Sequence, residues 1–428
     1  MEQLSQEELD KIIKKHLQFA RGQLGGSRAV IKFKNLSGLS FRQADLSHAD
    51  FSGCNLSKAN LSGGKYNSTS FFSCDLYKAN MKEGDFTRSD FRGAYIVGAD
   101  LTGANFGHSD LRRGIILNYD NTGADTEWNQ SGKTEFTGSI VRDTNMSNVT
   151  AQGTDFSDAN LSGVIIHQAN LDQADFSGAN LSYADFYGSS MTESILDSAI
   201  VDKTNITGVT GNLLAIERLI EEQRNRKNLS RDNVSIATLV EQHREWIDSA
   251  GKTGKQLYLV DYDLSMEKEL RTHPLTIIVA KSCKFAGLNL DGAKMESSIL
   301  DESNFQDCSA RNGDFRGSSF KGAQFTRADF SGSNFSTLQV TIAGKETGKT
   351  QVVNMTDANL SFAKLDNVNF EGANLSGADL SHASLIGADL RNCNLKGSNL
   401  NRTNLKDARL EGTILEEQVR KQRKKNKK

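Results

Sequence analysis

The sequence contains very little proline and no long hydrophobic segment. Only one of its 428 residues is proline, and hydrophobic residues make up 37% of the chain. No run approaches the roughly 18–20 apolar residues that a membrane helix needs, and the start MEQLSQEELDK lacks the apolar core of a secretory signal. We therefore expect neither a membrane span nor Sec export. Because leucine and phenylalanine recur evenly along the chain, we expect a folded protein rather than a disordered one.

The common motifs of catalysis and metal binding are also missing. The five cysteines include no C-x₂-C pair, and the seven histidines form no HExxH motif. The glycines show no G-x-x-x-x-G-K-[ST] phosphate loop, and no Ser-His-Asp order stands out. We therefore predict a protein that is not an enzyme and needs no cofactor, metal or small-molecule substrate. The net charge of −2 gives no overall reason to bind nucleic acid.

What the sequence does contain is a repeat of five residues. From Ala44 it runs ADLSH, ADFSG, CNLSK and ANLSG, so that a small residue, Asp or Asn, a large apolar residue and Ser recur in that order. A period of five fits neither the 3.6 residues of a helix nor the two residues of an ordinary strand. The central apolar residue falls at every fifth position over four stretches, 36–116, 136–206, 285–335 and 355–415.

This pattern resembles the pentapeptide-repeat family, whose motif is written A(D/N)LXX. The resemblance covers most of the chain and implies a right-handed quadrilateral β-helix, with one pentapeptide on each side and four in each coil. It also implies that the central residue and the small residue two positions before it point inward. The predicted fold class is therefore an all-β solenoid, with two such β-helices and α-helical caps and linker, in a bacterial cytoplasmic protein.

The spacing of phenylalanine and cysteine provides a check on this fold. If four pentapeptides complete a coil, residues 20 positions apart should stack about 4.8 Å apart, as neighbouring strands do. Phenylalanine recurs at this spacing at positions 51, 71 and 91, at 136, 156 and 176, and at 285, 305 and 325. The cysteines all lie two residues before a central residue, where we predict small, buried, reduced side chains: Cys54, Cys74, Cys283, Cys308 and Cys393.

Two interruptions break the repeat, one between Ile116 and Phe136 and one between Phe335 and Met355. One expected core position in the second is occupied by Lys345, and burying an unpaired lysine would cost several kcal/mol. We therefore predict extruded loops at about 117–135 and about 337–353. Because each gap matches one coil of 20 residues, we expect the later units to keep their faces. Such loops either carry recognition or are tolerated insertions.

A solenoid exposes a strand edge at each end, and these edges need covers. Ser5 and Glu8 predict a capping box at the start of a helix over 5–20, and 212–226 is predicted to cover the end of the first array. The motif His243-x-x-Trp246 repeats His16-x-x-Phe19, which indicates a duplicated module. The end after Leu415 has no hydrophobic cap, and we expect a homodimer there, with masking by the basic tail as the alternative.

Six segments follow from these predictions: an N-terminal capping helix (1–27), a first β-helix (28–210), a helical linker and cap (211–255), a second β-helix (256–415) with an irregular start (266–280), and a basic C-terminal tail (416–428). The candidate sites are charged. A possible acidic interaction surface lies between 143 and 202, where no Lys or Arg occurs: Asp143, Asp155, Asp158, Asp172, Asp175, Asp185, Glu193, Asp197 and Asp202. A possible polyanion-binding tail contains Arg420, Lys421, Arg423, Lys424, Lys425, Lys427 and Lys428.

Three functions are consistent with the sequence. The leading hypothesis is a non-enzymatic scaffold that mediates protein–protein interaction with an unidentified protein partner. The alternative follows from the resemblance, since some family members look like DNA rods, bind type II topoisomerases such as DNA gyrase and protect them from quinolones. It requires the acids to form one stripe rather than to scatter over four faces. In the third, the tail attaches to nucleic acid or an anionic membrane, unless it is a solvated, disordered terminus.

Overall fold

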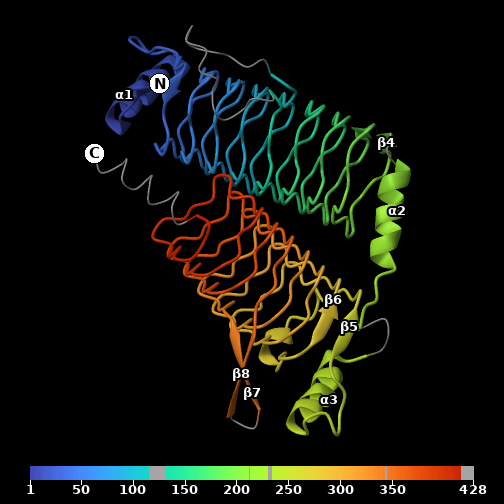
Figure 1. Ribbon diagram of the computed structural model, residues 1–428. Coiled ribbons are helices and arrows are strands. Elements are labelled where there is room, and N and C mark those ends of the chain that lie inside the picture. The colour runs from blue at the N-terminus through green and yellow to red at the C-terminus, as the bar shows by residue number, and fades with distance from the viewer. Residues whose placement is uncertain (115–131, 212, 230–233, 343–344, 416–428) are drawn as a thin grey trace. The chain divides into compact units, whose positions relative to one another are not determined.

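The computed structural model describes all residues except 115–131, 212, 230–233, 343–344 and 416–428. The chain divides into two compact units, Met1–Asn225 and Arg226–Lys428, each with its own hydrophobic core. Each unit is a solenoid of short strands, as Figure 1 shows. Because the division falls after Asn225, the segment 211–255 contributes to both units.

One pentapeptide forms each side of a coil because three backbone hydrogen bonds repeat every five residues. Leu46 N–H donates to Lys65 O (2.8 Å), and Lys65 N–H donates to Ala44 O (2.8 Å). Ala49 N–H closes a turn by donating to Leu46 O (3.0 Å). The strand contacts are parallel and join residues 20 positions apart, such as Asp45 and Lys65. Four pentapeptides therefore complete one coil, which confirms the predicted quadrilateral β-helix.

The corners between the sides need a left-handed backbone. The residue two positions after the central one has a positive φ, 57° at Gln43 and 64° at Gly63. Glycine adopts this conformation without steric cost, which explains its frequency at the corners. The large number of glycines therefore serves the fold, and does not indicate a phosphate-binding loop.

The inside of each coil is filled by stacked side chains. The predicted phenylalanine columns are confirmed, with ring centroids 4.7 to 5.6 Å apart along Phe51–Phe71–Phe91, Phe136–Phe156–Phe176 and Phe285–Phe305–Phe325. Aromatic contacts of this kind add about 0.5–1.5 kcal/mol per pair beyond the apolar area that they bury.

The small inward position explains the cysteines. All five thiols are free and buried, as predicted, and Cys54 Sγ–H donates to Ile31 O (2.9 Å). Thr69 makes the same bond from the same position, to Leu46 O (2.8 Å). The thiol therefore replaces a hydroxyl that satisfies a carbonyl of the previous coil. Burial raises the pKa of Cys54 to about 12, so its thiol is protonated at neutral pH.

The first interruption leaves the coil at one corner and returns there. Gly114 N–H donates to Gly132 O (2.8 Å), and the coil resumes at Glu135, which pairs with Tyr95. Most of the predicted loop 117–135, and Ile116, lie outside the described residues.

The second interruption is a β-hairpin made of β7 (Leu338–Ile342) and β8 (Lys345–Gln351), which are antiparallel. Here one prediction is wrong, because the later units do not keep their faces. Ser319 pairs with Asn354, 35 positions on, instead of with the residue 20 positions on. The hairpin starts and ends at the same corner, so the next pentapeptide takes the next face whatever the length of the hairpin.

Helices cover three ends of the two solenoids. α1 (Gln6–Ala20) begins with the predicted capping box between Ser5 and Glu8 and covers the first coil of the first unit. α2 (Leu213–Arg224) covers its last coil, with Ile216 in the core. α3 (Ile236–Asp248) covers the first coil of the second unit. The short strands are β1 (Glu2–Gln3), β2 (Lys34–Asn35), β3 (Ser190–Met191), β4 (Thr210–Gly211), β5 (Tyr258–Val260) and β6 (Val279–Lys281), and a 3₁₀ turn spans Leu270–Thr272.

Candidate interaction surfaces

The aspartates and asparagines that precede the central residues cap the turns. Asp155 Oδ1, for example, accepts hydrogen bonds from Ser157 N–H (2.9 Å) and Ser157 Oγ–H (2.6 Å). Asn60 holds Ser62 in the same way. Carboxylates at this position therefore have a structural role in local turns, as expected for Asp and Asn side chains. Where two carboxylates do approach each other, as Glu296 and Asp314 do, both are paired with the same arginine, Arg316 (3.0 and 2.7 Å).

In a second pattern, which the sequence did not suggest, the Asp that caps a turn comes from the previous coil. Where Ser190 replaces the usual Asp or Asn, Asp172 of the previous coil accepts the Ser190 hydroxyl and Thr192 N–H (2.8 Å). Three more such pairs occur in the described part of the chain. They join Asp291 with Ser309 and Arg311, Asp301 with Ser319 and Lys321, and Asp366 with Ser384 and Ile386. Burial raises the pKa of Asp172, but its hydrogen bonds outweigh burial and leave this pKa below its usual value.

The nine acids between 143 and 202 lie on all four faces of the first unit. We name each face after a central residue of the early coils. The strand register places four acids on the Leu36 face, two on the Phe41 face, one on the Leu46 face and two on the Phe51 face. In that order they are Asp155, Asp158, Asp175 and Asp197; Asp143 and Asp202; Asp185; and Asp172 and Glu193. One of them, Asp185, has a carboxylate oxygen 2.9 Å from Nε2 of His167.

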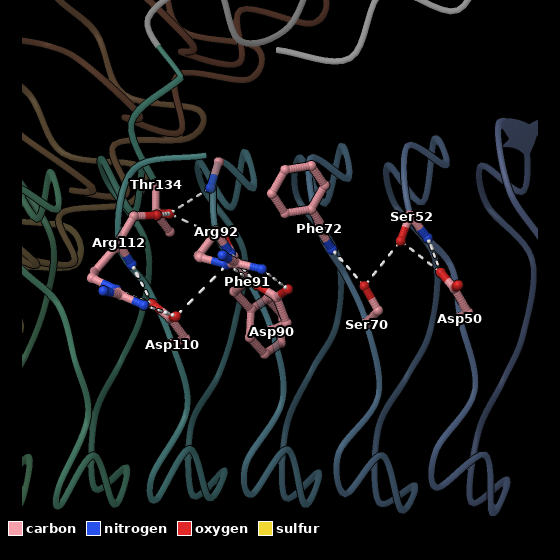
Figure 2. A network of polar contacts seen from close by, with 11 residues as sticks. Asp50, Ser52, Ser70, Phe72, Asp90, Phe91, Arg92, Asp110, Arg112 and Thr134 are labelled. Atoms are coloured by element: carbon pink, nitrogen blue, oxygen red, sulfur yellow. Dashed lines mark hydrogen bonds and ion pairs between the residues drawn. The ribbon is translucent and has the colours of Figure 1, made fainter. Parts of the chain in front are cut away.

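Before the first interruption, the Phe51 face carries paired charges. Figure 2 shows this network, in which Arg92 bonds Asp90 and also approaches Asp110 (3.7 Å), which is paired with Arg112. Arg92 also lies over the Phe72 ring, 5.4 Å from its centroid. Both arginines are 41–50% exposed, so each pair contributes little to stability. On this face, arginines and aspartates are therefore paired within one coil and between neighbouring coils.

The β7–β8 hairpin projects from the coil of the second unit (Figure 1). Its base is held against that coil, because Ser297 Oγ–H donates to Gln351 Oε1 (3.0 Å). A Cβ added to Gly317 would lie 3.1 Å from Leu338 Cβ, so the backbone approaches the hairpin closely here. The base is therefore fixed to a rigid rod.

The two solenoids end differently. The last described coil of the second unit contains Leu400 and Leu405, which are only half-buried, whereas Leu380 and Leu385 one coil earlier are fully buried. The N–H groups of Leu380 and Leu385 donate to the last coil, but those of Leu400 and Leu405 have no acceptor among the described residues. The predicted polyanion-binding tail follows this edge and lies outside the described residues.

Within the described part of the chain, no group of three or more His, Cys, Asp or Glu side chains could hold a metal ion. No helix in that part is long and apolar enough to span a membrane.

The repeat, the four-sided coil and the inward small residue together define a class, that of pentapeptide solenoids. The family model for pentapeptide repeats matches more than half of the chain, so the protein belongs to this family. The matches cover residues 27–63, 69–113, 133–168, 161–197, 169–208, 298–336, 354–392 and 378–416.

Solved structures of the same class resemble the chain only distantly. Trypsin-treated QnrB1, described as a plasmid-mediated fluoroquinolone resistance protein, is 20% identical, with a TM-score of 0.34, over 45% of this chain and 86% of its own. HetL from the cyanobacterium Nostoc sp. strain PCC 7120, described as involved in heterocyst differentiation regulation, is 15% identical over 92% of this chain and 94% of its own, with a TM-score of 0.15. Rfr23 from the cyanobacterium Cyanothece 51142 is 20% identical over 35% and 93%, with a TM-score of 0.16. The comparison with curated proteins gives no match.

Proposed function

We propose that the protein is a non-enzymatic scaffold that binds a protein partner through the β7–β8 hairpin. The observation that carries this proposal is the hairpin itself, an insertion anchored at its base to an uninterrupted coil. A rigid scaffold that presents an exposed insertion is a common arrangement for recognition. The Phe51 face before the first interruption, where arginines and aspartates are already paired with one another, contributes less.

Deletion of the hairpin tests this function cleanly. Removing residues 338–352 joins Thr337 to Val353 and restores the spacing of five between Phe335 and Met355, so the solenoid should fold unchanged. Removing residues 114–133 closes the first interruption in the same way, because it restores the spacing of five between Leu111 and Phe136. This deletion is the matched control. We expect affinity capture with quantitative mass spectrometry to lose a specific partner with the first deletion and to keep it with the second. If both variants recover the same proteins as the full chain, the hairpin is not the binding element.

A DNA mimic that binds a type II topoisomerase remains the alternative, with less support. Such a mimic needs a continuous line of carboxylates, and the nine acids of the 143–202 segment are spread over all four faces of the first unit. A gyrase supercoiling assay with and without a quinolone distinguishes the two functions. Inhibition or protection by the purified protein, without any partner specific to the hairpin, would favour the mimic.

We also propose a homodimer through the open end of the second unit. The half-buried Leu400 and Leu405 support it, together with their N–H groups, which have no acceptor among the described residues. Exposed strand edges pair with other strands. Substituting Leu405→Lys should convert the dimer to a monomer in sedimentation experiments. A wild-type protein that stays monomeric at high concentration would contradict the proposal.

A further inference from the structure

Four side chains on the capping helices bond backbone N–H and C=O groups at the ends of the solenoids. Gln6 on α1 accepts Ser40 N–H (2.8 Å) at Oε1 and donates from Nε2 to Ser40 O (2.9 Å). Gln223 on α2 accepts Val201 N–H (3.0 Å) and donates to Ala199 O (2.9 Å). Each glutamine therefore satisfies one N–H and one C=O group that one more coil would otherwise pair, a preceding coil at Gln6 and a following coil at Gln223.

Two buried histidines likewise bond one backbone N–H and one C=O group each with their rings. His16 Nδ1 accepts Ala29 N–H (2.9 Å), and His16 Nε2 bonds Ser47 O (3.0 Å). A backbone N–H can only donate and a carbonyl can only accept, so the hydrogen bonds require the neutral ring with its proton on Nε2. Protonation would place a hydrogen on Nδ1, directly opposite the N–H of Ala29.

The second module repeats this geometry. His243 Nδ1 accepts Leu257 N–H (3.0 Å), and its Nε2 bonds Thr276 O (2.9 Å). Both histidines are fully buried. To bond backbone groups at the coil ends, the chain thus uses two glutamine amides, which do not titrate, and two histidine imidazoles, which titrate near neutral pH.

We propose that His16 and His243 are acid-released latches, which hold α1 and α3 on the coil ends at neutral pH and let the helices open when the rings are protonated. Opening uncovers the edge of the first coil in each unit, and such edges pair with other strands. The release is stronger at α3, because α1 is also held by Gln6 and no such glutamine holds α3 among the described residues.

The surroundings of the two rings favour the neutral imidazole in the closed cap, as the proposal requires. Burial lowers the pKa of both histidines below the usual value of 6.5, and the carbonyls of Ser47 and Thr276 only partly oppose it. Three charged or titratable groups face His16. Asp45 raises its pKa, while Arg28 and His48 lower it. Among the described residues, the groups that contact the His243 ring are uncharged: the backbone of Leu257 and Thr276, and the Trp246 ring, whose centroid lies 5.8 Å away.

The lowered pKa values determine in which direction cap closure depends on pH. Because the open state binds the proton more readily, the latch is fully effective above about pH 6.5 and weakens as the pH falls below this value. If the closed form stays neutral, the ratio of open to closed cap rises at most about thirtyfold per histidine between pH 7.5 and pH 5. Most carboxylates titrate below this window.

Hydrogen–deuterium exchange of the full chain tests the proposal. Peptides that contain Ala29 and Leu257 should lose protection by up to thirtyfold between pH 7.5 and pH 5, after correction for intrinsic rates. His16→Gln and His243→Gln supply the non-titrating side chain that the chain itself uses at Gln6 and Gln223. Each variant should abolish the pH response at its own end and leave it at the other.

The pH dependence, rather than the absolute stability, is the readout, so a variant that weakens a cap at every pH is still informative. NMR of the histidine ring carbons provides a second measurement, in which both buried rings should titrate together with cap opening. A pH response that survives in the double variant would overturn the proposal. So would rings that titrate near 6.5 while both caps stay protected.

Discussion

The substitution Phe305→Ala should open the core of the second unit and leave the first unit intact. Phe305 is fully buried, and its ring stacks between Phe285 (4.7 Å) and Phe325 (5.2 Å). Removing a buried phenylalanine ring costs about 3–5 kcal/mol, and two lost stacking contacts place this site toward the upper end. Since a factor of ten corresponds to 1.4 kcal/mol, the equilibrium for opening should rise by about two to three and a half orders of magnitude.

The buried cysteines provide a local assay for this opening. Cys283 and Cys308 flank Phe305 in the second unit, whereas Cys54 and Cys74 lie in the first. Burial raises the pKa of Cys283 to about 11 and that of Cys54 to about 12, so native thiols should react slowly. Pulsed thiol labelling with mass spectrometry should show faster modification only in the second unit.

Two results would refute this reasoning. Equal acceleration at Cys54 would mean that the two cores unfold as one, in conflict with their separate hydrophobic clusters. No acceleration at Cys308 would mean that the ring column does not hold the coil together. The variant Phe176→Ala, in the matching column of the first unit, should give the reverse pattern.

Three further predictions concern single polar contacts. Asp301→Ala should lower the free energy of unfolding by about 1–2 kcal/mol in urea titrations, and adding Ser319→Asn should restore it by supplying a local turn cap; failure of the rescue would contradict the capping of this turn from the previous coil. Tyr66→Phe should cost about 1 kcal/mol in the same assay, because it removes the hydroxyl that donates to Phe41 O (3.2 Å). Hydrogen bonds from the neighbouring arginine hold the pKa of Asp389 below its usual value, so stability should fall as the pH drops from about 4, and Asp389→Asn should flatten that part of the curve of melting temperature against pH.

The sequence predicted the body of the solenoid well because each inward position repeats locally. The ring columns, the buried thiols and the capping box of Ser5 depend on residues whose roles are set within one pentapeptide or one coil. The hydrogen bond between Asp172 and Ser190 could not be predicted in this way, since it joins side chains of different coils through the strand register. A search for Asp eighteen positions before Ser, at the two appropriate repeat positions, would have found it.

The ends and interruptions were predicted less completely for a different physical reason. A hairpin whose two arms meet at one corner imposes no condition on its own length, so the gap after Phe335 could not fix the next face. The hydrogen bonds of the Gln6 and Gln223 side chains were also missed. Nothing in the repeat distinguishes a glutamine that covers the end of a solenoid from an exposed one. Their signal is geometric, and appears only when the unpaired edge is known.

These differences indicate where function should be sought in such a fold. Within a coil, the inward residues fill the interior, the Asp and Asn before them cap turns, and the positive-φ residues form corners, so substitutions at these positions should mainly change stability. The β7–β8 hairpin, the histidines under the caps and the open edge at Leu405 are not required by the repeat. Because a solenoid could fold with an uninterrupted coil and with glutamine in place of His243, the residues that depart from the repeat are those whose substitution can change binding without unfolding the rod.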